Sequence, residues 1–195
     1  MTSKELILKN IKDFNIVKDV PLPSYENFGI RYDDKFEIFS QMLESVGGKA
    51  LLIDKKDLDK TIQDLYPNEK QIASNVDFCT IGNFDANLCS DAHDLENIDV
   101  AIVKGNFAVA ENGAIWMKDD ENIHRALYFI AQNIVIVIDE KEILNNMHEA
   151  YEKINFDEKG FGVFISGPSK TADIEQSLVI GAHGPKSGYV IFIKS

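Results

Sequence analysis

The sequence has few cysteines, and their scarcity removes two classes of protein. Cys79 and Cys89 are the only two in 195 residues. Two cysteines give no disulfide framework, so we expect a reduced pair in the cytoplasm. An iron–sulfur cluster usually takes about four cysteine thiolates, so this chain cannot hold one by itself.

Positive charge is also scarce. The chain has 20 lysines and arginines against 32 acidic residues, a formal net charge of −12. Only Arg31 and Arg125 are arginines. A nucleic-acid-binding protein normally carries a basic stripe that displaces counterions from phosphate, and this sequence contains no basic cluster. Nucleic acid is therefore not an expected partner.

Long apolar runs are absent as well. The most apolar segment, Ala126–Ile138, is interrupted by Gln132 and Asn133 and falls short of the roughly 20 residues of a membrane span. The first ten residues contain the apolar run Leu6–Leu8 in a charged setting. A signal peptide would need an apolar region of roughly 7–15 residues. We therefore expect a cytoplasmic protein without a membrane span.

Helical and strand-like segments alternate along the chain. Helical spacing is present in Ser3–Phe14, Asp33–Gly48, Lys55–Tyr66 and Glu140–Ile154. Strand-like apolar runs occupy Lys49–Asp54, Ile98–Gly105, Ala108–Met117, Asn133–Asp139, Phe161–Ser166 and Tyr189–Lys194. This alternation predicts an α/β fold with a largely parallel central sheet and helices on both faces. We expect residues 1–30 to form a helix and an extended linker, and residues 31–195 to form the α/β domain.

One stretch between two strands, GPSKTADIEQSLVIGAHGP (Gly167–Pro185), is rich in polar and turn-forming residues. Ser169, Thr171 and Asp173 are suited to cap a helix that begins there, and a helix start attracts anions. His183 lies between glycines in a loop, where an imidazole can reach a ligand and titrate near neutrality. The alternative is that these residues only cap a helix and turn the chain.

A metal site in this stretch is not expected. Asp173 and Glu175 are two positions apart, so on a helix they would not face one ion together with His183. A second candidate lies in AVAENGAIWM, where Glu111 precedes an Asn-Gly turn inside an apolar frame. A carboxylate partly buried there must be paired, protonated or functional. A structural and a functional role for Glu111 both remain open.

These segments together resemble the LUD-domain family, in particular its lactate utilization protein C (LutC, also YkgG) members. The resemblance rests on the Gly167–Pro185 stretch, on AENGAI, and on HRALYFIAQNIVIVID before a buried strand, and it covers about the last hundred residues. It implies a fold like that of the NagB/RpiA/CoA-transferase group.

The resemblance also implies a function. LutC belongs to a three-protein system that oxidises L-lactate to pyruvate, whose other members carry iron–sulfur motifs. A cluster-free chain would then need iron–sulfur partner subunits and would bind a small carboxylate. The implied site residues are Glu111, Asp173 and His183 for catalysis, with Gly113, Arg125, Gly167, Pro168, Ser169, Thr171, Glu175 and Gly184 for ligand binding.

The chain departs from the family pattern at several positions. Asn112 and Ala114 stand where hydroxyl residues are common, and Ala131 and Asn133 stand near an expected proline and histidine. One interpretation of these departures is that the chain is a divergent LUD-domain protein that acts on another substrate. Two other functions remain open: an acyl-transfer enzyme of the CoA-transferase kind with Glu111 as nucleophile, and a ligand-binding or regulatory domain without turnover.

Overall fold

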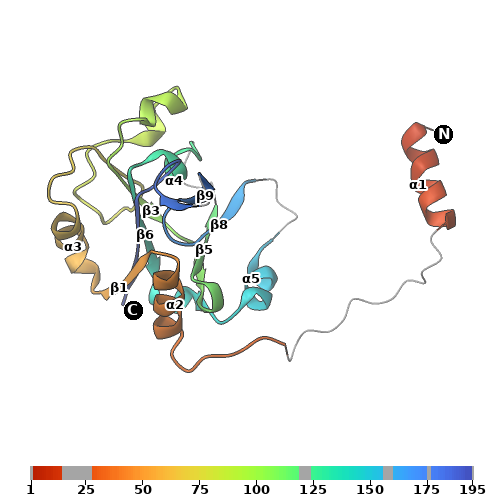
Figure 1. Cartoon of the computed structure of the whole chain (residues 1–195), viewed down its shortest axis with the longest axis horizontal. Coiled ribbons are helices and arrows are strands. Elements are labelled where there is room, and N and C mark those ends of the chain that lie inside the picture. The colour runs from red at the N-terminus through yellow and green to blue at the C-terminus, as the bar shows by residue number, and fades with distance from the viewer. Residues whose placement is uncertain (1, 15–27, 119–123, 156–159, 175–176, 195) are drawn as a thin grey trace.

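The computed structural model describes residues 2–14, 28–118, 124–155, 160–174 and 177–194 (Figure 1). For residues 172–174 and 177–178 it describes the backbone only. The predicted linker therefore lies almost entirely outside the described residues.

Within these ranges the central sheet has five strands, all parallel, in the order β1-β11-β6-β3-β2. Their bounds are β1 (Lys49–Ile53), β2 (Ile72–Ser74), β3 (Val100–Lys104), β6 (Asn133–Asp139) and β11 (Ser187–Ile193). The parallel sheet expected from the sequence is confirmed.

Strand β6 is buried on both faces, as its continuous β-branched run predicts. Alternate side chains enter two separate cores because successive residues of a strand point to opposite faces. Ile134, Ile136 and Ile138 share one core with Phe39 and Leu43 of helix α2 (Lys35–Ser45). Val135 and Val137 share the other with Leu58 and Ile62 of helix α3 (Leu58–Leu65). Helices therefore cover both faces of the sheet (Figure 1).

A second, mostly antiparallel sheet packs on the α2 side of the first. Its order is β7-β4-β5-β8, with bounds β4 (Phe107–Val109), β5 (Ala114–Lys118), β7 (Ile143–Leu144) and β8 (Gly162–Ile165). Strands β4 and β5 form the hairpin expected around Asn112-Gly113. Ala108, Ile115 and Ile143 join the core that contains Phe39. Because β8 is the strand next to β5 in this order, it belongs to the second sheet and not to the parallel one.

The helix expected over Glu140–Ile154 is wrong in its first half. A 3-10 turn covers Glu140–Glu142, and Ile143–Leu144 pairs as β7 with Ala108 and Val109 of β4. Only Met147–Lys153, helix α5, is helical. Pairing with a strand more than thirty residues earlier along the chain overrides the local helical spacing.

Helix α1 (Ser3–Phe14) forms as the spacing predicts, with no buried residue. Thr2 caps it, since the Thr2 hydroxyl accepts a hydrogen bond from the Glu5 amide at 3.3 Å. No helix in the described part of the chain is long and apolar enough to cross a membrane.

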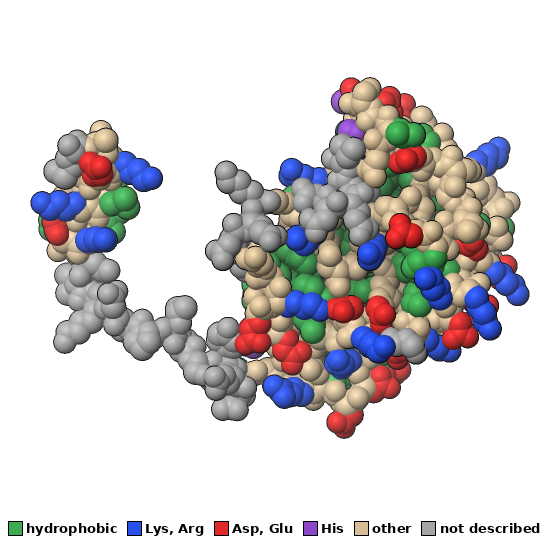
Figure 2. Space-filling model, turned by 180° about the vertical axis from the view of Figure 1, so that it is seen from behind, with side chains coloured by type: hydrophobic (Ala, Val, Ile, Leu, Met, Phe, Trp, Pro, Cys, Tyr) green, Lys and Arg blue, Asp and Glu red, His purple; other side chains and the backbone are tan. Residues whose placement is uncertain are grey.

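Charged side chains of both signs are interspersed over the face of the domain shown in Figure 2. This face carries no continuous basic stripe of the kind that binds nucleic acid.

Candidate functional site

The Gly167–Pro185 stretch folds as a β-hairpin and not as a helix. Strand β9 (Lys170–Ile174) pairs antiparallel with β10 (Ser177–Ile180), with Thr171 opposite Val179. The prediction of a helix beginning in this stretch is therefore wrong, because its described residues on both sides of positions 175–176 form strands and offer no helix start to an anion. β-branched residues at several positions favour the extended conformation once strand pairing is available.

The two polar ends of the stretch meet in space. The Ser169 amide donates a hydrogen bond to the Pro185 carbonyl at 2.9 Å, and the Gly181 amide donates to the Ser169 carbonyl at 2.9 Å. These bonds bring Gly167–Ser169 beside His183–Pro185, although the hairpin separates them in sequence.

A cavity of about 300 Å³ lies where these ends meet, and we call it the motif cavity. Five of the residues named from the sequence line it: Gly167, Pro168, Ser169, His183 and Gly184. Its other lining residues are Tyr128, Phe129, Ile134, Phe164, Ile165, Ser166, Lys170 and Pro185. The aromatic and aliphatic wall of the cavity was not predicted from the sequence. Two of its aromatic rings, Tyr128 and Phe129, come from helix α4 (Leu127–Ile130), which lies within the segment HRALYFIAQNIVIVID.

The motif cavity lies at the amino edge of the parallel sheet. Ile134 is near the start of β6, and Pro185 comes just before β11. Although the Gly167–Pro185 stretch follows strand β8, it does not lie at the carboxyl edge of the parallel sheet, because β8 belongs to the antiparallel sheet.

The carboxyl end of α2 forms one border of the site. Gly167 has φ +70°, and a Cβ there would lie 2.9 Å from the Val46 carbonyl oxygen, so the chain needs glycine at this close approach. The Lys170 ammonium donates to the same carbonyl at 2.6 Å. Burial lowers the pKa of Lys170. Lys170 therefore interacts favourably with the negative end of the α2 dipole.

The Glu111-Asn112-Gly113 turn lies beside the motif cavity without lining it. The Ser166 hydroxyl donates to the Asn112 carbonyl at 3.2 Å, which joins the turn to the start of the stretch. The Glu111 Oε1 accepts a hydrogen bond from the Met147 amide at 2.7 Å, at the first turn of α5. The Glu111 carboxylate therefore has a structural partner, and the geometry does not bring it together with His183.

The remaining predicted site residues are not among those that line the motif cavity. Arg125 is exposed, and its guanidinium carbon lies 4.9 Å from the Phe161 ring centroid. Thr171 is half-buried in β9. The Asp173 side chain and all of Glu175 lie outside the described residues, so their roles stay predictions.

Asn133, which stands near the position of an expected histidine, is a buried structural residue. Its side-chain amide donates to the Asp99 carbonyl at 3.0 Å, and its Oδ1 accepts from the Ser187 hydroxyl at 2.8 Å. Ser187 also shares a 2.6 Å hydrogen bond with the Tyr66 hydroxyl. Burial raises the pKa of Tyr66 to about 12. This network joins the amino ends of β3, β6 and β11.

Both cysteines are free thiols in the structure, and desolvation raises the pKa of Cys79 and of Cys89. Within the described residues no group of three His, Cys, Asp or Glu side chains is arranged to hold a metal ion.

Substitution of Glu111 separates its structural role from a nucleophilic one. Glu111→Gln keeps an oxygen acceptor for the Met147 amide, so we expect a change in unfolding free energy below about 0.5 kcal/mol. Glu111→Ala leaves that amide without its partner and should be destabilising by roughly 1–2 kcal/mol. Urea unfolding of both variants measures the difference. A covalent thioester on wild-type Glu111 after incubation with acyl-CoA would contradict a purely structural role.

Comparison with known proteins agrees with this architecture. The LUD domain model matches residues 90–193. The chain belongs to the LUD domain family. A solved structure of a DUF162 family protein from Deinococcus radiodurans superposes with a TM-score of 0.67 at 18% identity, over 82% of this chain and 96% of that one.

Relatives in this family carry the name lactate utilization protein C. The protein of that name from Bacillus pumilus is 32% identical over 104 residues, which are 50% of this chain and 43% of that protein. The one from Geobacillus thermodenitrificans is 30% identical over 143 residues, 69% of this chain and 56% of that protein. The chain thus spans about half the length of these relatives.

Proposed function

We propose that this chain is the cluster-free subunit of an iron–sulfur system that oxidises L-lactate to pyruvate, and that the motif cavity holds the small carboxylate. The observation that carries the proposal is the meeting of Gly167–Ser169 with His183–Gly184 in one cavity, within the region that matches the LUD domain. The names of the relatives support lactate as the substrate class.

The cavity offers a small hydroxy acid both polar and apolar contacts. The Ser169 hydroxyl and the His183 imidazole are groups that hydrogen-bond a carboxylate or a hydroxyl. The Phe129 and Phe164 rings form an apolar wall against which a methyl group packs. Arg125, two residues before helix α4, supplies a cation in the segment that leads to the cavity residues Tyr128 and Phe129.

The chemistry requires an electron acceptor outside this chain. Oxidation of lactate at C2 removes a pair of electrons and a pair of protons from the substrate. We assign the hydroxyl proton to His183, whose imidazole is a proton acceptor in reach of the cavity. The C2–H bond breaks with its proton released to water, and its electron pair would be taken up by the partner subunits, whose iron–sulfur clusters would supply the acceptor, since two cysteines do not supply the usual ligands of a cluster.

Co-purification tests the partner requirement. A tagged chain isolated anaerobically from native cells grown on lactate should carry two cysteine-rich proteins, identified by mass spectrometry. Cells grown without lactate are the control. A chain that elutes alone from both cultures would contradict the proposed subunit role.

A further inference from the structure

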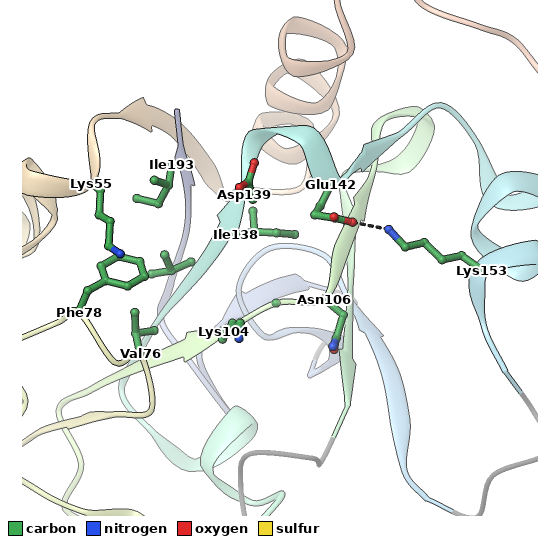
Figure 3. Close-up of a pocket in the computed structure, with 12 residues that line it drawn as sticks. Lys55, Val76, Phe78, Lys104, Asn106, Ile138, Asp139, Glu142, Lys153 and Ile193 are labelled. Carbon is green, nitrogen blue, oxygen red and sulfur yellow. Dashed lines mark hydrogen bonds and ion pairs between the residues drawn. The ribbon is translucent and has the colours of Figure 1, made fainter. Parts of the chain in front are cut away.

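A second cavity, larger than the motif cavity, lies at the opposite edge of the parallel sheet. It has a volume of about 520 Å³. Its lining includes residues at or just beyond the carboxyl ends of β1, β3, β6 and β11: Lys55, Lys104, Gly105, Asn106, Ile138, Asp139 and Ile193. We call it the carboxyl-edge cavity (Figure 3). In parallel sheets this edge is where ligands commonly bind, because the loops after the strands converge there.

Lysines outnumber acids in this lining, against the strongly negative balance of the whole chain. Lys55, Lys104 and Lys153 line the cavity together with Asp139 and Glu142. Lys153 forms an ion pair with Glu142, and the two lie together at one side of the cavity in Figure 3. The lining as a whole therefore carries three lysines against two carboxylates, a net positive charge.

The remaining acid has a local role. Asp139 Oδ1 accepts a hydrogen bond from the Lys141 amide at 2.9 Å and caps the 3-10 turn after β6. On the other side of the cavity the Lys55 ammonium lies 4.3 Å from the centroid of the Phe78 ring. Lys55 therefore places a positive charge beside an aromatic ring on this side of the cavity.

The Lys55 side has an apolar wall. Val76, Val137 and Ile193 are buried in the core on the α3 side of the sheet, and Phe78 packs against them, whereas Ile138 lines the cavity from the other face. Small-molecule sites in proteins have volumes of roughly 300–1,000 Å³, with mostly apolar walls and a few polar groups that fix orientation. A three-carbon acid would leave most of this cavity empty, so the ligand is larger than lactate.

We infer that the carboxyl-edge cavity binds a small organic anion with a planar apolar body. The apolar body packs against Phe78 and Ile193, and the anionic group is held by Lys55 and Lys104. This site is separate from the motif cavity, and its occupation does not depend on His183.

Fluorescence titration with 8-anilinonaphthalene-1-sulfonate tests the inference, since this probe joins a sulfonate to planar apolar rings. Lys55→Met and Lys104→Met remove charge and retain the apolar stems, and both side chains are exposed, so the variants should fold. We expect each to raise the Kd of the probe roughly tenfold, as loss of a charge-assisted contact does. Thermal melting of each variant confirms the fold.

Matched controls locate the site. Lys56→Met removes an exposed lysine next to Lys55 that does not line the cavity, and His183→Ala changes the motif cavity. Both should leave the Kd within about twofold of the wild-type value. If Lys55→Met and Lys104→Met bind the probe as tightly as Lys56→Met, the inference is wrong. Because the probe is not lactate, this outcome would leave the proposed lactate function unaffected.

Discussion

Replacement of His183 by alanine should lower lactate-dependent dye reduction by the assembled system about 100-fold, since a positioned proton acceptor contributes roughly 10²–10⁴-fold. The imidazole lines the motif cavity, and alanine offers no group that accepts the substrate proton. Initial rates of dye reduction with L-lactate, measured on complexes of equal iron content, give the ratio directly.

His93→Ala is the matched control for this loss. His93 is an exposed histidine that pairs with Asp91 at 2.7 Å and lies outside the motif cavity. Its removal should leave the rate of lactate oxidation unchanged. Equal rates for the His183 and His93 variants would refute the assignment of a proton-transfer role to His183.

Gly113→Ala should lower the unfolding free energy by roughly 2–4 kcal/mol. Gly113 has φ +63°, and a Cβ there would lie 2.8 Å from the Leu43 amide nitrogen of α2. Both the left-handed conformation and the clash with the helix backbone oppose a side chain. Denaturant unfolding at a pH near 7 measures the change.

Gly47→Ala separates the two contributions. Gly47 also has a positive φ, +86°, but a Cβ there would meet nothing closer than a Pro168 side-chain atom at 3.6 Å. This variant should therefore lose about 1–2 kcal/mol, the conformational term alone. If Gly113→Ala and Gly47→Ala are equally destabilising, close packing of the turn against α2 is not what requires glycine at position 113.

The sequence was sufficient to predict elements whose conformation is set by their own local pattern. Asn133–Asp139 is a continuous β-branched run, and it forms the strand with the same bounds, covered on both faces. Helix α1 matches its expected bounds as well. The helical spacing of its apolar residues predicts α1, whereas the short length and β-branched composition of Asn133–Asp139 predict a strand, since a continuous apolar run has no period.

Local pattern failed where distant pairing decides the structure. Ile143–Leu144 has helical neighbours in sequence, but it completes a sheet with β4. Lys170–Ile180 has good capping residues, but β9 and β10 pair with each other. The residues of each segment do not show whether a helix or a strand is more stable there. The strand-pairing energy depends on the residues of the partner strand, which lie elsewhere in the sequence.

Local sequence pattern also predicted only part of the candidate site. Turn-forming residues identified both polar ends of the motif cavity, since Gly167 and His183–Gly184 stand out by type. The apolar wall from Tyr128 and Phe164 looked like ordinary core. The carboxyl-edge cavity carries no sequence motif, because Lys55, Lys104 and Lys153 come together only through the fold.

The most direct test of the proposed role is the visible spectrum and lactate-dependent dye reduction of the anaerobically isolated tagged chain. If the chain is a subunit of a lactate-oxidising complex, the eluate should be brown, should show iron–sulfur absorbance and should reduce dye when L-lactate is added. Both signals should be absent from a mock purification of the same cells without the tagged chain. A colourless protein that elutes without partners and gives no dye reduction with L-lactate would contradict the account.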